Sequence, residues 1–305
     1  MDKSENQKTA FISIVGRPNA GKSSILNAVL GSKVAIVSHK PQTTRTCIRG
    51  IMTEGPVQLV FIDTPGLLKP RSRLGKYMVR SVVEAISGVD ACLLVEEAGE
   101  KISPSSRELI EKFKKQKIPA LLALNKVDLL TDKSVLLKQI AEFSKLYDFK
   151  AVVPVSALDG SGIHSLKEEL CKMAQPGIHF FDDDAITDQP ERVIASEIIR
   201  EKMLRLLSSE VPHGVAVNVE KMSERAGGLT DISAIIYCEK ESHKGIIIGR
   251  NGAMLKRIGT YAREDMENFF GCKINLKLWV KVRENWRNKA DALRAFGYDS
   301  SDFDK

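Results

Sequence analysis

The chain has 305 residues, more than one hydrophobic core usually organises, so we expect two domains. Hydrophobic residues at 43% and charged residues at 28% indicate a folded globular protein and exclude a disordered or fibrous one. The net charge of +7 favours polyanionic partners, such as nucleic acid or an acidic membrane surface. The five cysteines show no CxxC or metal-binding spacing, and no signal peptide or membrane-spanning run is evident. We therefore expect a cytoplasmic protein, at most peripheral to a membrane.

Short apolar runs alternate with amphipathic segments over residues 1–175. The predicted strands are 11–15, 57–62, 91–95, 120–124 and 151–155. The predicted helices lie near 22–30, 74–87, 104–116, 134–147 and 163–174. Buried strands separated by helices predict an α/β domain, with a mostly parallel sheet and helices on both faces.

Residues 176–190 contain prolines and an acidic cluster, and we predict a linker there. Beyond it, residues 191–305 predict a small α+β domain with a C-terminal tail. Its predicted elements are a helix at 191–209, strands at 215–219 and 231–238, a loop and helix over 246–270, and a strand at 274–283. Apolar residues alternate along the last strand, so Trp279 and its polar neighbours should face away from the core. We favour packing of Trp279 against the last helix over stacking on a base.

GRPNAGKS, from Gly16 to Ser23, matches the phosphate-binding pattern GxxxxGK[ST] between a strand and a helix. The glycines let backbone N–H groups point at phosphate oxygens, and the helix N-terminus adds partial positive charge. We assign Lys22 to the β- and γ-phosphates and Ser23 to Mg²⁺. The alternative is a chance glycine turn. The predicted nucleotide contacts here are Gly16, Arg17, Pro18, Asn19, Ala20, Gly21, Lys22, Ser23 and Ser24.

Three further motifs follow the later predicted strands. In DTPG (63–66), Asp63 would hold Mg²⁺ through water and the Gly66 N–H would meet the γ-phosphate. In NKVD (125–128), the Asp128 carboxylate would accept from the N1–H and the exocyclic amine of guanine, a donor pair that adenine lacks. In SAL (156–158), a backbone N–H would reach the guanine carbonyl. The remaining predicted contacts are Thr64, Pro65, Leu67, Asn125, Lys126, Ser156, Ala157 and Leu158.

Four such motifs at carboxyl strand ends resemble the translation-factor-like GTPases, which implies GTP and GDP as ligands. Where the best-known relatives carry a glutamine that orients water, this chain has Leu67, so we expect slow intrinsic hydrolysis. The first switch should lie within 32–50, with Thr44, or alternatively Thr43, as a Mg²⁺ ligand, and the second over 67–76. The predicted catalytic residues are Lys22, Thr44 and Gly66, and the predicted Mg²⁺ ligands are Ser23, Thr44 and Asp63.

Asn19 matches an asparagine that helps coordinate a monovalent cation in some of these GTPases. A K⁺ ion there could supply the charge that an arginine finger supplies elsewhere. This resemblance makes K⁺ a hypothetical cofactor beside Mg²⁺.

GRNG (249–252) is a second glycine-rich loop, without the Lys–Ser pair of a nucleotide loop. Its setting resembles a type II KH domain, whose GxxG loop clamps about four nucleotides of single-stranded RNA. Between Lys244 and Arg294 there are twelve basic and five acidic residues, a local excess equal to the charge of the whole chain. The alternative is a solvated basic face. The predicted RNA contacts are Ile248, Gly249, Arg250, Asn251, Gly252, Lys256, Arg257, Lys277 and Lys281.

A GTPase domain joined to a type II KH domain resembles the Era family of bacterial GTPases. KPQTTR (40–45), FDDDAITDQPERVIASEIIREK (181–202) and LWVKVRENW (278–286) strengthen the resemblance, which covers essentially the whole chain. It implies binding near the 3′ end of 16S ribosomal RNA, assistance in assembly of the small (30S) ribosomal subunit, and partial association with the inner face of the membrane. We expect a monomer. One departure, VEEAGEK (95–101), should affect only local loop contacts.

Two other functions remain open from the sequence. Hydrolysis could be too slow to matter, so that GTP occupancy alone sets RNA affinity in a nucleotide-gated binding module. Alternatively, the basic face could bind anionic lipid in a membrane-peripheral signalling GTPase. The paired glycines of GRNG disfavour the second alternative, because a lipid-binding patch does not need them.

Overall fold

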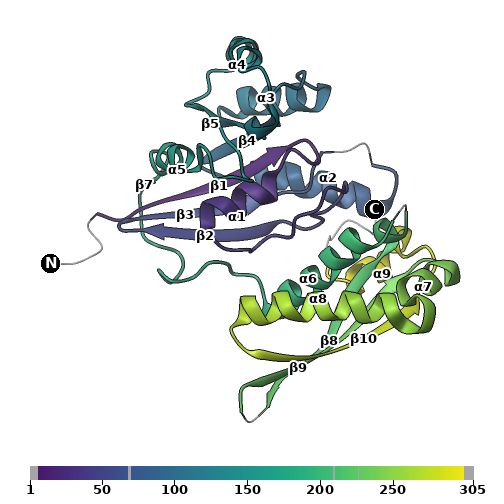
Figure 1. Ribbon diagram of the computed structural model, residues 1–305. Helices are drawn as coiled ribbons and strands as arrows, with labels where there is room; N and C mark the ends of the chain where they lie inside the picture. Colours follow the sequence, from purple (N-terminus) through teal and green to yellow (C-terminus); the bar gives the residue numbers. More distant parts are fainter. Residues whose placement is uncertain (1–5, 68–69, 209, 226, 299–305) are drawn as a thin grey trace. The chain divides into compact units, whose positions relative to one another are not determined.

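The computed structural model describes residues 6–67, 70–208, 210–225 and 227–298. They form two compact units (Figure 1). The first holds the described residues of 1–35, 44–69 and 78–188, and the second those of 36–43, 70–77 and 189–305. Each unit has its own hydrophobic core.

A mostly parallel sheet forms the centre of the first unit (Figure 1). Its strands are β1 (Lys8–Gly16), β2 (Ile48–Glu54), β3 (Val57–Asp63), β4 (Ala91–Glu97), β5 (Ala120–Asn125), β6 (Val152–Pro154) and β7 (Gln175–Pro176). The order is β2-β3-β1-β4-β5-β6, and β7 pairs with the start of β1. Strands β3, β1, β4, β5 and β6 run parallel, so their carboxyl ends meet at one edge of the sheet. This edge is where open α/β sheets bind ligands.

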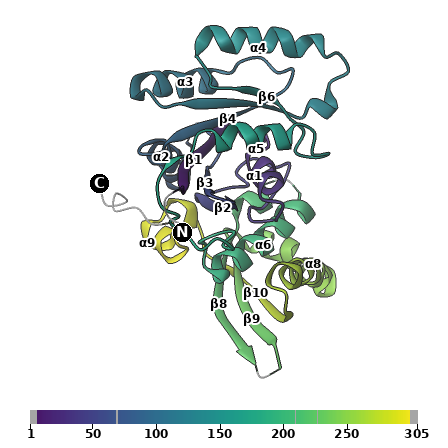
Figure 2. The same ribbon diagram turned by 90° about the vertical axis from the view of Figure 1, so that its left-hand side faces the viewer.

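Helices cover both faces of this sheet, as predicted. They are α1 (Lys22–Leu30), α2 (Arg73–Ile86), α3 (Pro104–Gln116), α4 (Ser134–Leu146) and α5 (Ile163–Cys171). Helices α1 and α5 bury Leu26 and Leu166 in one cluster, while α3 and α4 bury Phe113 and Phe143 in another. Figure 2 shows α1 and α5 on the opposite side of the strands from α2.

Strand β2 was not predicted from the sequence. It pairs antiparallel with β3 through a tight turn at Gly55, whose φ of 57° suits a glycine. β2 lies at the edge of the sheet, and its apolar run is interrupted by Arg49 and Gly50. Edge strands lack the continuous hydrophobic run of a central parallel strand. The start of β2 was therefore assigned to the first switch.

Most of the segment predicted as a linker, 176–190, packs along the first unit. The Phe180 N–H donates to Oε1 of Gln58 at 2.8 Å, and the Ile51 N–H donates to the carbonyl of Ile186 at 2.9 Å. The unit boundary falls between residues 188 and 189. The extended backbone of this segment forms hydrogen bonds with the sheet. The prolines and acidic residues of the segment do not predict these hydrogen bonds.

The second unit contains a three-stranded sheet with its two longest helices on one face (Figure 1). Its elements are α6 (Glu191–Leu206), β8 (Ala216–Arg225), β9 (Leu229–Cys238), α7 (Glu241–Ile248), α8 (Ala253–Phe270), β10 (Lys273–Val282) and α9 (Ala290–Ala295). The order is β10-β9-β8, with β9 and β10 parallel and β8 and β9 antiparallel. Buried residues of α6 and α8, such as Ile199, Ile258 and Met266, form the core with the strands.

One sequence interpretation in this unit was wrong, because the apolar run at 246–248 is the last turn of α7 and not part of the predicted loop. Trp279, for which packing against the last helix was favoured, is 47% exposed. Trp286 takes the buried position instead, and its Nε1 donates to the carbonyl of Gly214 at 2.9 Å.

Candidate functional site

The loop between β1 and α1 has the geometry that a phosphate group needs. Gly16 and Gly21 have φ angles of 147° and 95°, in the region that favours glycine. A Cβ at Gly16 would clash with the carbonyl oxygen of Val95 on the neighbouring strand β4. Helix α1 has no side-chain cap at its N-terminus, so its first N–H groups stay available to an anion.

Lys22 lies inside this loop, almost fully buried. Its Nζ donates to the carbonyls of Arg17 at 2.9 Å and Gly16 at 3.3 Å. Burial lowers the pKa of Lys22, while the nearby charges of Asp63 and Glu96 oppose that shift. The side chain is therefore already folded over the loop where phosphates would sit.

The three predicted Mg²⁺ ligands come together although they are far apart in the sequence. The Ser23 hydroxyl donates to Oδ2 of Asp63 at 2.6 Å, and the Thr44 hydroxyl donates to the same oxygen at 3.2 Å. The two hydroxyl oxygens are 2.9 Å apart. The other carboxylate oxygen of Asp63, Oδ1, is buried with no hydrogen-bond partner. Burial also raises the pKa of Asp63.

An all-oxygen set with an unpaired buried carboxylate oxygen suits a hard divalent cation. The cation would offset the cost of burying the carboxylate of Asp63, because it would place a positive charge beside the unpaired oxygen. The residues present therefore fit Mg²⁺. The structure places Thr44 with this set, whereas the alternative ligand Thr43 donates its hydroxyl to the carbonyl of Lys40 at 2.6 Å.

Asn125 connects three parts of the predicted nucleotide site. Its Nδ2 donates to the carbonyl of Ala20 at 2.8 Å, and its Oδ1 accepts from the Ala157 N–H at 3.1 Å. The phosphate loop, NKVD and SAL are thus tied together by one side chain. Asp128 follows on an exposed turn, where its carboxylate is open to a base. The Ser156 hydroxyl accepts from the N–H groups of Leu158 and Asp159, both at 3.3 Å.

VEEAGEK contributes to this site, contrary to the expectation of purely local contacts. Glu97 forms an ion pair with Lys126 of NKVD at 2.6 Å. Glu96 is buried, accepts from the Ser106 hydroxyl at 2.5 Å, and lies close enough for its charge to act on Lys22. The sequence predicted the end of the strand before these residues. It did not indicate whether Glu96 or Glu97 would face the phosphate loop.

The first switch segment divides between the two units, and residues 36–43 belong to the second. There the Val37 N–H donates to Oε1 of Glu201 on α6 at 3.0 Å. The neighbouring Arg200 donates to the carbonyl of Thr43. Both α6 side chains are almost completely buried. The segment before Thr44 is therefore held by the second unit, while Thr44 itself belongs to the first.

The expected second switch, 67–76, is only partly described, because Leu68 and Lys69 lie outside the described residues. Leu67 is half-buried against the cluster beneath α2 and α3. In the second unit, the Arg73 N–H donates to Oδ1 of Asn288 at 3.2 Å.

GRNG forms a sharp break between helices α7 and α8. Gly249, Asn251 and Gly252 have φ angles of 73°, 50° and 78°, so the chain turns through left-handed conformations. A Cβ at Gly249 would lie 2.7 Å from Cβ of Met254. Helix α8, 18 residues long, has no side-chain cap; the Ala253 N–H donates to the carbonyl of Arg250, and the next N–H groups stay available at this break.

The predicted RNA contacts fall into two groups. The first surrounds the break, where Ile248 is half-buried and Arg250, Asn251, Lys256 and Arg257 are exposed. Lys277 and Lys281 form the second group, on the face of β10 that points away from the helices, since the alternating leucines and valines pack in the core. The structure therefore does not bring these two lysines to the GRNG loop. The ring of Tyr261 is 41% exposed and lies beneath the guanidinium of Arg257.

Both domains match known families. Residues 11–126 match the family described as 50S ribosome-binding GTPase, and residues 210–287 match the KH domain family. The chain is 48% identical to GTPase Era of Clostridioides difficile (strain 630), over 96% of this chain and 99% of the relative. It is 50% identical to GTPase Era of Ruminiclostridium cellulolyticum, over 96% and 98%.

Two solved structures share the fold along 96% of this chain and all of theirs, each with a TM-score of 0.92 and 35% identity. One is a variant of Aquifex aeolicus Era bound to GDP and AlF4⁻. The other is an Era in complex with MgGDPNP and nucleotides 1506–1542 of 16S ribosomal RNA. Among the helices of the described chain, none has the length and hydropathy to cross a bilayer.

Asp128→Asn should exchange guanine for xanthine as the preferred base. The amide still accepts from N1–H, but its NH₂ group suits the 2-carbonyl of xanthine and not the 2-amine of guanine. The hydrogen bond from N1–H loses its charge assistance and the bond from the 2-amine is lost, so GDP affinity should fall by about 100- to 1000-fold and XDP affinity should rise. Isothermal titration calorimetry with both nucleotides measures this. Unchanged GDP affinity would contradict the role of Asp128.

Proposed function

The chain belongs to the GTPase Era family, and on that premise we propose that it is a GTP-hydrolysing switch protein in ribosome assembly. In this proposal the KH domain binds 16S ribosomal RNA near its 3′ end and the protein assists maturation of the small ribosomal subunit. The observation that carries the proposal is that one chain holds both a complete guanine-nucleotide site and an uncapped GxxG helix break. The relative solved with MgGDPNP and the 1506–1542 segment supports the pairing of the two ligands.

In the proposed reaction, water attacks the γ-phosphate of GTP, and GDP and phosphate are released. Lys22 and the backbone N–H groups of the phosphate loop would neutralise the phosphate oxygens in a largely buried, preorganised site. Gly66 would add its N–H to the γ-phosphate. Ser23, Thr44 and Asp63 would hold Mg²⁺, which supplies further charge neutralisation when bound.

We propose that Leu67 keeps the intrinsic rate of this reaction low. Its half-buried aliphatic side chain cannot hydrogen-bond to the attacking water. Intrinsic turnover should therefore be slow and should rise when a partner orders the switches. A nucleotide-gated RNA-binding module without useful hydrolysis is the second candidate, and Leu67 is the observation that favours it.

We also propose K⁺ as a cofactor, held in part by Asn19. The backbone of Asn19 is left-handed, with φ of 62°, which fixes the asparagine within the phosphate loop. A monovalent cation there should raise single-turnover hydrolysis by about tenfold or more in KCl compared with NaCl. The measurement is phosphate release at equal ionic strength, with Asn19→Asp as a second variant that keeps an oxygen ligand. Equal rates in the two salts would reject the K⁺ proposal.

Peripheral membrane association remains a separate proposal, which rests on the basic surface of the KH domain. In a membrane-signalling GTPase the GRNG geometry would have no use. Binding of the protein to anionic vesicles but not to RNA would favour that candidate over ours.

The double substitution Arg250→Asp and Asn251→Asp tests the RNA assignment. It places two carboxylates at the uncapped N-terminus of α8, where they compete with phosphate for the same N–H groups. Affinity for the 1506–1542 RNA segment should fall by about tenfold to a hundredfold, while GDP affinity stays unchanged. Fluorescence anisotropy measures RNA binding, and Arg250→Lys, which keeps the charge, serves as the control. Retained RNA affinity in the double variant would contradict the assignment.

A further inference from the structure

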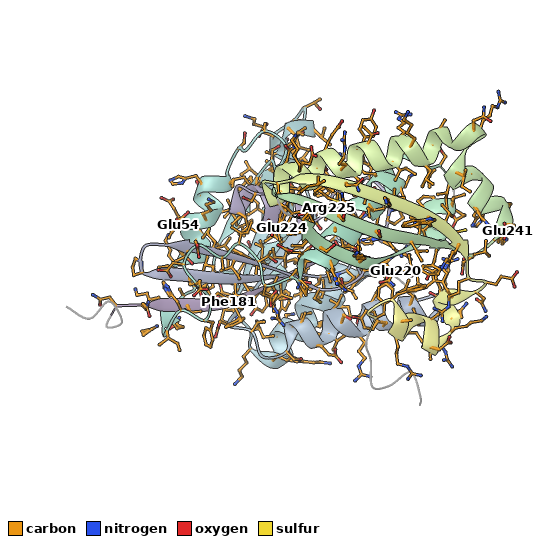
Figure 3. All side chains as sticks on the ribbon, turned by 90° about the horizontal axis from the view of Figure 1, so that it is seen from below. Glu54, Phe181, Glu220, Glu224, Arg225 and Glu241 are labelled. Atoms are coloured by element: carbon orange, nitrogen blue, oxygen red, sulfur yellow. The ribbon has the colours of Figure 1, made fainter. Side chains whose placement is uncertain are left out.

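The outer face of the three-stranded sheet carries residues that the GRNG site does not use. Along β10, Leu276, Leu278 and Val280 join the core beneath α8. Lys277 and Trp279 lie between them and face the other way. Figure 3 views the protein from below, where the three strands lie side by side toward the reader.

Strand register places one apolar and several polar residues beside these side chains. Trp279 pairs with Ile235 on β9, which pairs with Asn218 on β8. Lys277 pairs with Ser233, which pairs with Lys221. The middle of this face thus combines one large aromatic ring beside the buried Ile235 with hydrogen-bonding groups and cationic side chains.

Trp279 is unusual among the aromatic residues of this unit. Its ring is 47% exposed and contacts no other aromatic ring or cation within the described parts of the chain. Trp286, by contrast, is fully buried, stacks on Tyr298 and satisfies its N–H. A partly exposed indole on the surface of a sheet has a π-face on which a planar ligand can stack.

The charges around Trp279 complement a polyanion. Lys221, Lys277 and Lys281 are exposed, and none forms an ion pair with a residue that the structure describes. The rise of a strand puts Lys277 and Lys281 about 13 Å apart, one on each side of Trp279. Asp231 on the same face is neutralised by Arg225, whose guanidinium donates to its Oδ1 at 2.8 Å.

We propose that this face is a second contact surface for single-stranded RNA, in which a base stacks on Trp279 and phosphates lie against Lys277, Lys281 and Lys221. The inference rests on the proposed function, because it assumes that the protein binds RNA. Stacking on an aromatic ring beside cationic groups tolerates any base, so this surface adds affinity and not sequence preference. Glu220, exposed beside Lys221, bounds the cationic area on β8.

The two RNA surfaces lie on opposite faces of one sheet. GRNG sits between α7 and α8, on the side of α6 and α8, whereas Trp279 is on the other side, where Phe296 packs on Tyr237. β10 is an edge strand, so a single strand of RNA can pass around it from one face to the other. An oligonucleotide that fills only the GRNG loop, about four nucleotides, is too short to reach both surfaces.

The test compares RNA oligonucleotides of about six and about sixteen nucleotides from the 1506–1542 segment, chosen to span one or both surfaces. The full-length protein is used throughout. Trp279→Ala should weaken binding of the long oligonucleotide by about tenfold and leave the short one unchanged. Trp279→Phe should retain most of the affinity because the ring remains. The double variant Lys277→Ala, Lys281→Ala should bind the long oligonucleotide more weakly, and its binding should depend less on salt concentration.

A matched control removes two charges elsewhere. Lys138 and Lys145 are exposed on α4 of the first unit, so Lys138→Ala with Lys145→Ala should leave both affinities unchanged. Tryptophan emission gives a second readout. RNA should quench the emission of the wild-type protein and not that of Trp279→Phe, whose remaining Trp286 is buried.

Three outcomes would overturn the inference. If Trp279→Ala binds both oligonucleotides as the wild type does, while Arg250→Asp with Asn251→Asp loses binding, the sheet face is not an RNA surface and the proposed function stands. If the wild-type protein binds neither oligonucleotide, the proposed function itself fails. If Trp279→Ala weakens binding to phosphatidylserine vesicles and not to RNA, the face is a membrane surface instead.

Discussion

The parallel pairing of β1 with β3 and β4 is the constraint on which the nucleotide site depends. It brings the ends of strands from distant parts of the sequence to one edge, and there Ser23, Thr44 and Asp63 meet within hydrogen-bonding distance. Asn125 then ties the loops predicted to bind the base to the phosphate loop through two hydrogen bonds. All of these hydrogen bonds join residues far apart in the sequence. The site therefore forms only when the sheet is complete.

Both proposed ligand sites use the same physical device. Each places a glycine with left-handed backbone, Gly21 or Gly252, directly before a helix whose N-terminus has no side-chain cap. The unsatisfied N–H groups and the helix dipole attract phosphate in either case. What differs is the surrounding charge. Lys22 is buried and directed at one compact ligand, whereas Arg250, Lys256 and Arg257 are exposed along a surface that can follow a polymer.

The sequence predicted the α/β domain, the nucleotide motifs and the small α+β domain, because buried strands and glycine loops leave strong local patterns. It did not predict β2, whose edge position weakens the pattern, or the packing of residues 176–188, whose partners are distant. It did not determine how far Trp279 is covered, since alternation assigns a face to a side chain but does not say whether anything covers that face. The pairing of Glu97 with Lys126 was missed for a similar reason: it depends on the β4–β5 register.

The central claim is that one switch serves both ligands, and chain continuity offers a route for coupling. Thr44 belongs to the Mg²⁺ set, while Thr43 before it is held by Arg200 of α6, in the unit that carries GRNG. The most direct measurement is single-turnover GTP hydrolysis with and without the 1506–1542 RNA segment at saturating concentration. Coupling between the two sites should make hydrolysis faster with RNA, because RNA binding helps order the first switch. RNA that binds and leaves the rate unchanged would contradict coupling and make the KH domain only an anchor.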